Sequence, residues 1–395
     1  MELKPGYKQT EVGVLPENWD VTRLRDVAQI RSGIAKNSNV VVNDPVLVHY
    51  LRVANVQDGF LDLSEMSKIE VSRSNLKRYA VLPGDVLMNE GGDLDKLGRG
   101  SIWLGQFDPC VHQNHVFVVR CGSRLSPQYL NKWSGAAAAR RYFMVAGKQT
   151  TNLASINKTA LGGLSVATPP LQEQRAIAET LGDVDELLVG LEQVIAKKRD
   201  LKKAAMQVLL TGKKRLPGFA VEWEVKQLGE VVQIRKGQLI TSDTICKGDI
   251  PVIAGGKQPA YFHNLANRKG CTITVSASGA SAGYVALYKM PIFASDCSTI
   301  SEDRSYSIDF IYYQLLLKQQ LIYSSQTGGA QPHIHAADLR PIEITVPNLP
   351  EQTAIAEALT EMDSELTVLE LRLAKTRALK QGMMQQLLTG KVRLI

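Results

Sequence analysis

The sequence predicts an α+β fold in which two globular domains of short, mixed strands are separated by two long helices. Three observations predict it. A helix-forming segment of 44 residues occurs twice, a weaker repeat precedes each copy, and the two intervening blocks are rich in β-branched residues and turn signals. We expect the two helices to form an antiparallel coiled coil in a circular, pseudo-two-fold arrangement.

The longer repeat pairs residues 173–216 with residues 351–394, at a constant offset of 178 residues. The two copies are identical at 25 of 44 positions, whereas unrelated segments of ordinary composition share roughly one position in fifteen. This similarity indicates an internal duplication.

Each copy is predicted to be one long helix, because it lacks proline and is rich in Ala, Leu, Glu, Lys, Gln and Met. Prolines just before each copy mark its start, and Gly212 and Gly390 are suited to the caps at its end. A helix of about 38 residues would be about 57 Å long. Apolar residues at steps of three and four predict a coiled-coil interface. They are Leu181, Val184, Leu188, Leu191 and Ile195 in the first copy, and Leu359, Met362, Leu366, Leu369 and Leu373 in the second.

The weaker repeat pairs residues 15–33 with residues 216–237, and it aligns Trp19 with Trp223. The sequence LLTGKKRLPGF at the central junction would be recreated if Leu394 were joined to Leu15. The sequence is therefore nearly circular, and we expect its two ends to lie close together.

The predicted domain boundaries are 1–168 for the first globule, 169–215 for the central helix, 216–346 for the second globule and 347–395 for the second helix. Each globule contains several short strands and one candidate helix, at 126–143 and at 307–325. A loop rich in Gly, Gln and Thr follows each candidate helix. The globules share this order of elements but little sequence, which favours two domains that recognise two different things.

Composition restricts the class of protein. The chain has 395 residues, a net charge of +7 and a pI of about 9.0, which suits a polyanionic partner. It has no apolar run of 18 residues and no apolar segment typical of a secretory signal, so we expect a cytoplasmic protein without membrane contact. The five cysteines are scattered and form no C-x-x-C, which favours reduced thiols over a zinc site or disulfides.

Catalytic motifs are not evident. The sequence has neither a phosphate-binding P-loop nor a glycine-rich dinucleotide loop after a strand. The segment TPPL at 168–171 lacks the Asn and the aromatic residue of adenine methyltransferase motifs, and a role in helix entry explains it better. The pairs His112/His115 and His333/His335 lack a third metal ligand nearby. Glu90 and Asp93 form either an acid pair or a polar turn.

The features that remain favour DNA binding. Arg, Asn and Gln make paired hydrogen bonds to guanine and adenine edges, while Lys, Ser and Thr suit phosphates. In the first globule the candidates are Arg52, Asn55, Asn89, Lys96, Arg99, Asn114, Arg140, Arg141, Gln149 and Asn152. In the second they are Lys236, Lys257, Arg268, Ser278, Ser281, Gln331 and His333. The basic run from Lys197 to Lys203 is a solvated face, a subunit contact or a phosphate contact.

The paired E-Q-x-A-I-A-E…L-L-T-G-K segments resemble the specificity subunit of Type I restriction–modification systems, as do YLRVANVQDG at 50–59 and LMNEGGDLDKLGRG at 87–100. The resemblance covers nearly the whole chain. It implies two target recognition domains that each read half of a bipartite DNA site, with a coiled coil that sets their spacing. It also implies two adenine-N6 methyltransferase subunits and motor–nuclease subunits as partners, with adenosyl-methionine, ATP and Mg²⁺ bound by those partners. The chain itself would be non-catalytic, with no cofactor and no metal.

Other interpretations remain open at this point. A recognition subunit of a related Type II-like system would lack a separate motor. A coiled-coil scaffold with two heads that bind protein or sugar would not bind DNA. A free-standing enzyme is disfavoured by the missing motifs.

Overall fold

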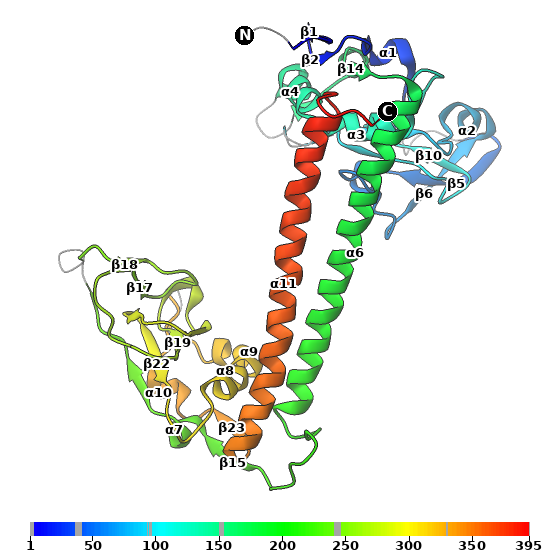
Figure 1. Cartoon of the computed structure of the whole chain (residues 1–395). Coiled ribbons are helices and arrows are strands. Elements are labelled where there is room, and N and C mark those ends of the chain that lie inside the picture. Colours follow the sequence, from blue (N-terminus) through cyan, green and yellow to red (C-terminus); the bar gives the residue numbers. More distant parts are fainter. Residues whose placement is uncertain are drawn as a thin grey trace. The chain divides into compact units, whose positions relative to one another are not determined.

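The computed structural model describes residues 4–35, 42–92, 94, 97–149, 154–240, 246–328 and 331–394. The chain divides into two compact units (Figure 1). Unit 1 comprises Met1–Gly190 and Leu373–Ile395, and unit 2 comprises Leu191–Arg372. We call residues 4–168 head 1 and residues 216–346 head 2. Each head is followed in the chain by one of the two long helices.

Head 1 consists of short strands with short helices between them. Its strands are β1 (Tyr7–Thr10), β2 (Gly13–Pro16), β3 (Asp20–Arg23), β4 (Ala28–Ser32), β5 (Pro45–Leu51), β6 (Ser67–Ser72), β7 (Val86–Asn89), β8 (Gly91–Gly92), β9 (Gly100–Ile102), β10 (Cys110–His112), β11 (Val116–Cys121), β12 (Lys148–Gln149), β13 (Ala154–Ser155) and β14 (Ser165–Thr168). Its helices are α1 (Leu24–Val27), η1 (Val53–Asn55), α2 (Arg73–Tyr79), α3 (Pro127–Ser134), α4 (Ala137–Ala146) and α5 (Lys158–Gly162).

Head 2 repeats the order of the main strands and helices of head 1 with fewer elements. Its strands are β15 (Glu224–Gln227), β16 (Ile234–Lys236), β17 (Ile250–Ile253), β18 (Tyr261–His263), β19 (Thr272–Ser276), β20 (Val285–Tyr288), β21 (Phe293–Ala294), β22 (Cys297–Ser301) and β23 (Glu343–Val346). Its helices are α7 (Leu228–Val231), η4 (Gly279–Ser281), α8 (Ile308–Leu317), α9 (Gln319–Ser324) and α10 (Ala336–Leu339).

The two heads share one sheet topology, although their sequences differ. The four-stranded antiparallel sheet has the order β4-β11-β7-β9 in head 1 and β16-β22-β19-β20 in head 2. In the three-stranded sheet, β5 pairs in parallel with β10 and antiparallel with β6, and β17 pairs in the same way with β21 and β18. The pairs β3·β14 and β15·β23 complete the correspondence. The prediction of duplicated α+β domains is therefore confirmed.

The main core of each unit lies between the four-stranded sheet, the short helices and the ends of the long helices. In unit 1, Phe117 of β11 and Trp133 of α3 pack in one cluster with Leu181 and Leu387. In unit 2, Phe310 of α8 packs in one cluster with Leu210 and Leu359. Burial of such large side chains supplies about 1.5–3 kcal/mol each, so each head is stabilised by the helix ends that it contacts.

The two long helices have equal length, as the repeat predicts. Helix α6 (Leu171–Leu209) and helix α11 (Leu349–Leu387) each contain 39 residues. Each ends in a glycine with a left-handed backbone, Gly212 (φ 68°) and Gly390 (φ 64°). The amides of Gly212 and Gly390 bond the carbonyls of Leu209 and Leu387, and those of Lys214 and Val392 bond the carbonyls six residues back, so both helices end in the same way.

The helices pair antiparallel within each unit. In unit 2, Lys198 contacts Glu365 (2.6 Å) and Lys202 contacts Asp363 (2.5 Å), so the residue number falls on α11 as it rises on α6. In unit 1, Asp185 of α6 contacts Lys380 of α11 (2.5 Å). The predicted antiparallel direction is confirmed, and part of the basic run is used between the helices.

All ten side chains of the predicted coiled-coil stripe are buried or half-buried. Leu191, Ile195 and Leu366 are among the buried ones. Leu181 and Leu359 are members of the main hydrophobic clusters of units 1 and 2. The first residue of each stripe therefore belongs to the core of a unit, in addition to lying on the predicted contact face of its helix.

The Glu-Gln pair that opens each repeat explains why this motif is duplicated. The carboxylate of Glu173 is fully buried, accepts a bond from Trp19 Nε1 (3.0 Å) and is held by the guanidinium of Arg393. Glu351 is equally buried and accepts from Trp223 Nε1 (3.1 Å) and from Arg215 (2.6 Å). We call these two sets of contacts the carboxylate latches.

The amides of the following glutamines cap the head helices. Gln174 accepts from the backbone N–H of Ser126 (2.8 Å), and Gln352 accepts from that of Ser307 (3.0 Å). In unit 1, Tyr7 also donates to the carbonyl of Gly390 (3.0 Å). The residues at the two ends of the sequence therefore meet in unit 1, as its near-circular pattern predicts.

The candidate helices at 126–143 and 307–325 are each divided into two. Helix α3 ends at Gly135, where the Cβ of another residue would lie 3.3 Å from Met384 of α11. In head 2 the division is at Lys318, between α8 and α9. Both segments are helical, as the propensities of their residues predict, but those propensities do not mark the position of the break.

Among the described residues, no helix combines the length and the apolar character needed to cross a membrane. The five cysteines are free thiols.

Candidate nucleic-acid interface

Equivalent backbone bonds identify the same location on both heads. In head 1 the amide of Asn89, at the end of β7, donates to the carbonyl of Arg99 (3.0 Å). In head 2 the amide of Ser276, at the end of β19, donates to the carbonyl of Tyr284 (3.0 Å). Arg99 and Tyr284 therefore occupy equivalent places, each just before the edge strand of the four-stranded sheet.

In head 1 this location gathers charged groups from three segments. Arg140 of α4 donates to both oxygens of Asp58 (3.0 and 2.9 Å), and Arg99 Nε lies 3.5 Å from the same carboxylate. The amide of Gly59 donates to the carbonyl of Gly100 (2.9 Å), which fixes the loop that carries Asp58. Two predicted DNA-contacting arginines thus converge on one carboxylate, which is half exposed (49%).

Polar side chains extend along the adjoining strand ends of head 1. Asn114 Nδ2 lies 3.2 Å from His115 Nε2, and His115 Nδ1 lies 2.8 Å from Glu90. Gln149 is exposed on β12, which pairs with β13 and through it with β8. Arg141, the neighbour of Arg140, is exposed as well. These groups are placed to meet a polar ligand.

In head 2 the equivalent location is also cationic but is built from other residues. Lys257, in the loop after β17, lies over the ring of Tyr284 with its Nζ 5.5 Å from the centroid, a favourable cation–π contact. Lys236, Lys257 and Gln331 are exposed. His333 lies beside this site, since its backbone bridges Ser278 and its ring stacks on His335 at 6.3 Å. Ser281, at the end of η4, is half-buried.

Some predicted DNA contacts are corrected by the structure. Asn55 is buried (3% exposed), and its amide accepts from the N–H of Arg52 and donates to the carbonyls of Asp62 and Glu65. Asn89 is also buried and donates to the carbonyl of Val56 (2.8 Å). Both asparagines close loops of the backbone, a use of Asn that sequence does not distinguish from base recognition. Arg52 keeps part of its surface and donates to the carbonyl of Glu65 (3.3 Å).

Arg268 and Ser278 are occupied by internal contacts. Arg268 donates to Thr299 Oγ1 (3.0 Å) and to the carbonyls of Asn267 (2.9 Å) and Lys236 (3.1 Å), and burial lowers its pKa. We therefore correct the prediction for Arg268 to a structural role between β16 and β22. The hydroxyl of Ser278 is bonded to Asp296.

Lys96 and Asn152, two further predicted contacts, lie outside the described residues. The acidic member of the head 1 site, Asp58, was missed by the sequence prediction because a carboxylate is repelled by phosphate and is not sought in a DNA site. The signal available for it is the turn Gln57-Asp58-Gly59 within a segment already assigned to the site.

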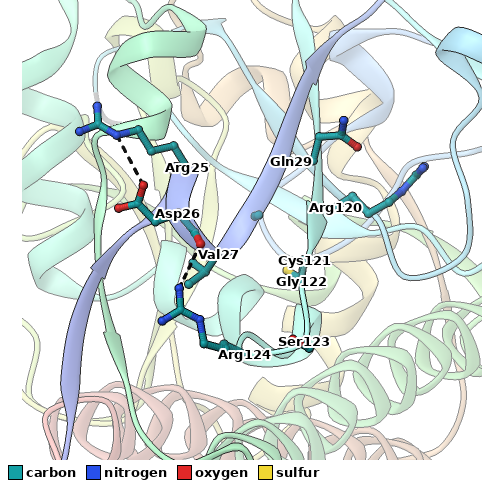
Figure 2. A pocket seen from close by; sticks show the side chains of 10 residues that line it. Arg25, Asp26, Val27, Gln29, Arg120, Cys121, Gly122, Ser123 and Arg124 are labelled. Atoms are coloured by element: carbon teal, nitrogen blue, oxygen red, sulfur yellow. Dashed lines mark hydrogen bonds and ion pairs between the residues drawn. The ribbon is translucent and has the colours of Figure 1, made fainter.

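An arginine-lined pocket of about 600 Å³ lies elsewhere on head 1 (Figure 2). Arg25 of α1, Arg120 of β11 and Arg124 line it. Arg124 donates to the carbonyl of Asp26 (3.1 Å). Arg120 forms two bonds with Asp85 (2.7 and 2.6 Å), which raise its pKa. The charge of Arg120 is therefore largely used inside the head.

Two histidines considered as metal ligands point to different environments. His112 is buried, and its Nδ1 donates to the carbonyl of Val116 (2.6 Å), while His115 is exposed and contacts Glu90. Among the described residues no group of three His, Cys, Asp or Glu side chains is arranged to hold a metal ion.

Comparison with known proteins identifies relatives of the whole chain. A model of the Type I restriction modification DNA specificity domain matches residues 220–375. The putative type I restriction enzyme MjaX specificity subunit of Methanocaldococcus jannaschii is 26% identical, with 98% of this chain and 96% of that protein covered. The MjaVIII specificity subunit of the same organism is 23% identical over 96% of this chain and 94% of that protein.

The fold is that of solved relatives. The crystal structure of the S subunit of a Type I restriction–modification system from M. genitalium covers 98% of both chains with a TM-score of 0.65 and 14% identity. A second match is a chain from a structural study of complex assembly and conformational transition in the type I R-M system. It has a TM-score of 0.55 and 17% identity, and the match covers 96% of this chain and 99% of that one. In its duplicated heads, its paired helices and its matches along the full length of the chain, this protein is similar to the specificity subunits of Type I restriction–modification systems.

Proposed function

We propose that the protein is the DNA-recognition subunit of a Type I restriction–modification complex, in which each head reads one half of a bipartite target. The observation that carries this proposal is the equivalence of the two heads. They share the four-stranded sheet, the three-stranded sheet built on β5 or β17, and the pair β3·β14 or β15·β23. The same location nevertheless carries Asp58, Arg99 and Arg140 on head 1 and Lys257 and Tyr284 on head 2. A shared frame with different side chains is what two readers of different sequences require.

The long helices give the second contact its affinity. Once one head is bound, the other binds intramolecularly, and the gain is large only when the spacing of the half-sites matches the connection. Helices α6 and α11 each run from one unit into the other. We infer that their length sets the unread spacer of the target.

The proposed partners are two adenine-N6 methyltransferase subunits and motor–nuclease subunits in the cytoplasm. The proposed docking surface consists of the apolar side chains that are exposed on the long helices, because apolar patches of a surface mark sites of protein interaction. They are Leu187, Val189 and Leu379 in unit 1, and Val194, Leu201, Val368 and Leu371 in unit 2. Adenosyl-methionine, ATP and Mg²⁺ are then carried by the partners.

The chain itself is proposed to be non-catalytic. Its more deeply buried thiols are poor nucleophiles, because burial raises the pKa of Cys110 and Cys297 to about 12. His112 has no access to a substrate, since it lies in the interior. In this proposal the adenine is modified after it is flipped into a pocket of the methyltransferase.

The test is co-expression with the proposed adenine methyltransferase partner, in a host without adenine methylation. Genomic DNA is then sequenced at single-molecule resolution for N6-methyladenine, with the methyltransferase alone as the control. The expected result is one bipartite motif with a fixed unread spacer that appears only when both chains are present. If both proteins are soluble and no new motif appears, the proposal fails and a scaffold role is favoured.

A further inference from the structure

The candidate interface of head 1 contains its own counter-ion. Asp58 forms two contacts of 3.0 and 2.9 Å with Arg140 and one of 3.5 Å with Arg99. The two arginines are mostly covered, at 25% and 26% exposed, whereas Asp58 is 49% exposed. The carboxylate is therefore the most exposed member of this group, and it takes up hydrogen-bond donors of the two guanidinium groups that a phosphate or a base edge would use.

Among the described residues of head 2, no carboxylate is paired with two arginines at the equivalent place. The loop after β17, residues 254–260, contains no acidic residue, and it places Lys257 over Tyr284. The carboxylate of Asp296, beside Gly255, bonds the hydroxyl of Ser278. The two heads thus present one location in two electrostatic forms, one masked by an acid and one open.

Masking has different consequences for random and for target DNA. Random DNA is held almost entirely through phosphates, so a carboxylate that repels phosphate and occupies two arginines removes part of its attraction. A target also offers hydrogen bonds to base edges. Because the Asp58 carboxylate is half exposed, solvent screens these ion pairs, and hydrogen bonds worth about 1–3 kcal/mol for each correctly read base are able to displace it.

We propose that Asp58 is a specificity-determining residue, which withholds Arg99 and Arg140 from non-target DNA and releases them when head 1 meets its half-site. This inference rests on the proposed function, because it assumes that head 1 binds DNA. It also makes the heads unequal. Head 2 supplies more of the attraction to random DNA, and head 1 supplies more of the discrimination.

The test compares Asp58→Asn with Glu70→Gln in the complete complex with the methyltransferase. Glu70 is exposed on β6 and its replacement removes the same charge from the same head. Affinity is measured between 0.05 and 0.3 M salt for a random-sequence duplex and for a duplex carrying the methylated motif. Each phosphate contact regained steepens the salt dependence by about 0.9 and strengthens binding about fivefold near 0.15 M salt.

We expect Asp58→Asn to bind the random duplex between about fivefold and thirtyfold more tightly, for one or two regained contacts, with a steeper salt dependence. Affinity for the target should rise by less, so the ratio of the two affinities falls. Glu70→Gln should leave that ratio unchanged. Equal effects of the two substitutions on random DNA would overturn the inference.

Arg140→Gln provides an independent arm that does not require Asp58→Asn to fold. Because Arg140 is withheld from random DNA, its loss should weaken target binding by about tenfold and random binding by less than about twofold. In the double variant the gain from Asp58→Asn should be reduced. A uniform loss on both duplexes contradicts the inference, whereas failure of the wild-type complex to bind or methylate any DNA contradicts the proposed function itself.

Discussion

The buried imidazole of His112 links the stability of head 1 to pH. Burial lowers its pKa to about 4, although its bond to the carbonyl of Val116 partly opposes the shift. In the unfolded chain a histidine titrates near 6.5. Between these values the unfolded state binds a proton that the folded state refuses, so stability falls as the pH decreases.

We predict that unfolding becomes easier by about 3 kcal/mol between pH 6.5 and pH 4 because of this residue. His112→Asn, which keeps a donor for Val116, should remove most of that dependence. Urea denaturation of the complete chain at several pH values measures it. His115→Asn, at the exposed neighbour, should keep the wild-type slope, and an unchanged slope in His112→Asn would contradict the explanation.

Single residues were the least predictable level of this structure. The types expected at a DNA interface, Arg, Asn and Gln, are also those that tie loops together, and composition does not separate the two uses. Arg99 and Arg140 lie together at the candidate interface, whereas Asn55 and Asn89 are buried among backbone carbonyls. Which use applies depends on contacts with residues far along the chain, such as that of Arg140 with Asp58.

At the scale of elements, the carboxylate latches connect each head to a long helix through a buried glutamate. Arg393 neutralises Glu173, whose side chain has no exposed surface. Removing one partner of a buried pair leaves an uncompensated charge, which typically costs about 3–5 kcal/mol.

We therefore predict that Arg393→Ala destabilises unit 1 by about 3 kcal/mol or more. Hydrogen exchange should rise in the peptides of β3 and β14 and remain at the wild-type level in those of β15 and β23. Arg215→Ala in unit 2 should give the reciprocal pattern. Equal exchange in both units for either variant would show that the latches do not act locally.

The two helix-ending glycines offer a matched comparison. Both have a left-handed backbone, which costs a residue with a side chain about 1–2 kcal/mol. A Cβ on Gly390 would also lie 2.4 Å from Pro16 and must displace it, whereas a Cβ on Gly212 would lie 3.3 Å from Trp223.

We predict that Gly390→Ala lowers stability more than Gly212→Ala does, by several kcal/mol against about 1–2 kcal/mol. Thermal unfolding of the two purified variants compares them directly. The same loss for both would mean that the contact with Pro16 relaxes freely.

Elements were more predictable than residues, for reasons that the helices illustrate. The 39-residue helices were predicted because propensity, periodicity and caps agree along a sequence that occurs twice. The strands were predicted from β-branched runs such as Val116–Cys121. The division of the head helices at Gly135 and Lys318 was not predicted. At Gly135 the neighbour that leaves little room for a side chain is Met384 of the distant helix α11, which local sequence does not reveal.

At the scale of the whole molecule, the proposed spacing by the helices can be tested by changing their length. Seven residues inserted after Gly190 in α6, and seven at the facing position after Leu373 in α11, keep the apolar stripe in register. They add about 10 Å to each helix.

We predict that the unread spacer of the methylated motif grows by one to three base pairs, three being the limit set by axial length at 3.4 Å per base pair. The half-site bases should stay the same, because the heads are unaltered. Single-molecule sequencing of the methylated genome reads both. A spacer of unchanged length in a folded, active variant would show that the helices do not determine it.

The division of the chain between the units has a consequence for its synthesis. Unit 2 is one continuous stretch, while unit 1 is completed only by residues that follow α11's midpoint. Head 1 leaves the ribosome first, but Leu387, Leu388 and Arg393, which complete its core and neutralise Glu173, are translated about two hundred residues later. Head 1 is therefore synthesised before head 2, but its unit is completed after unit 2. During that interval its apolar surface is exposed, and exposed apolar surface makes nascent chains prone to aggregation.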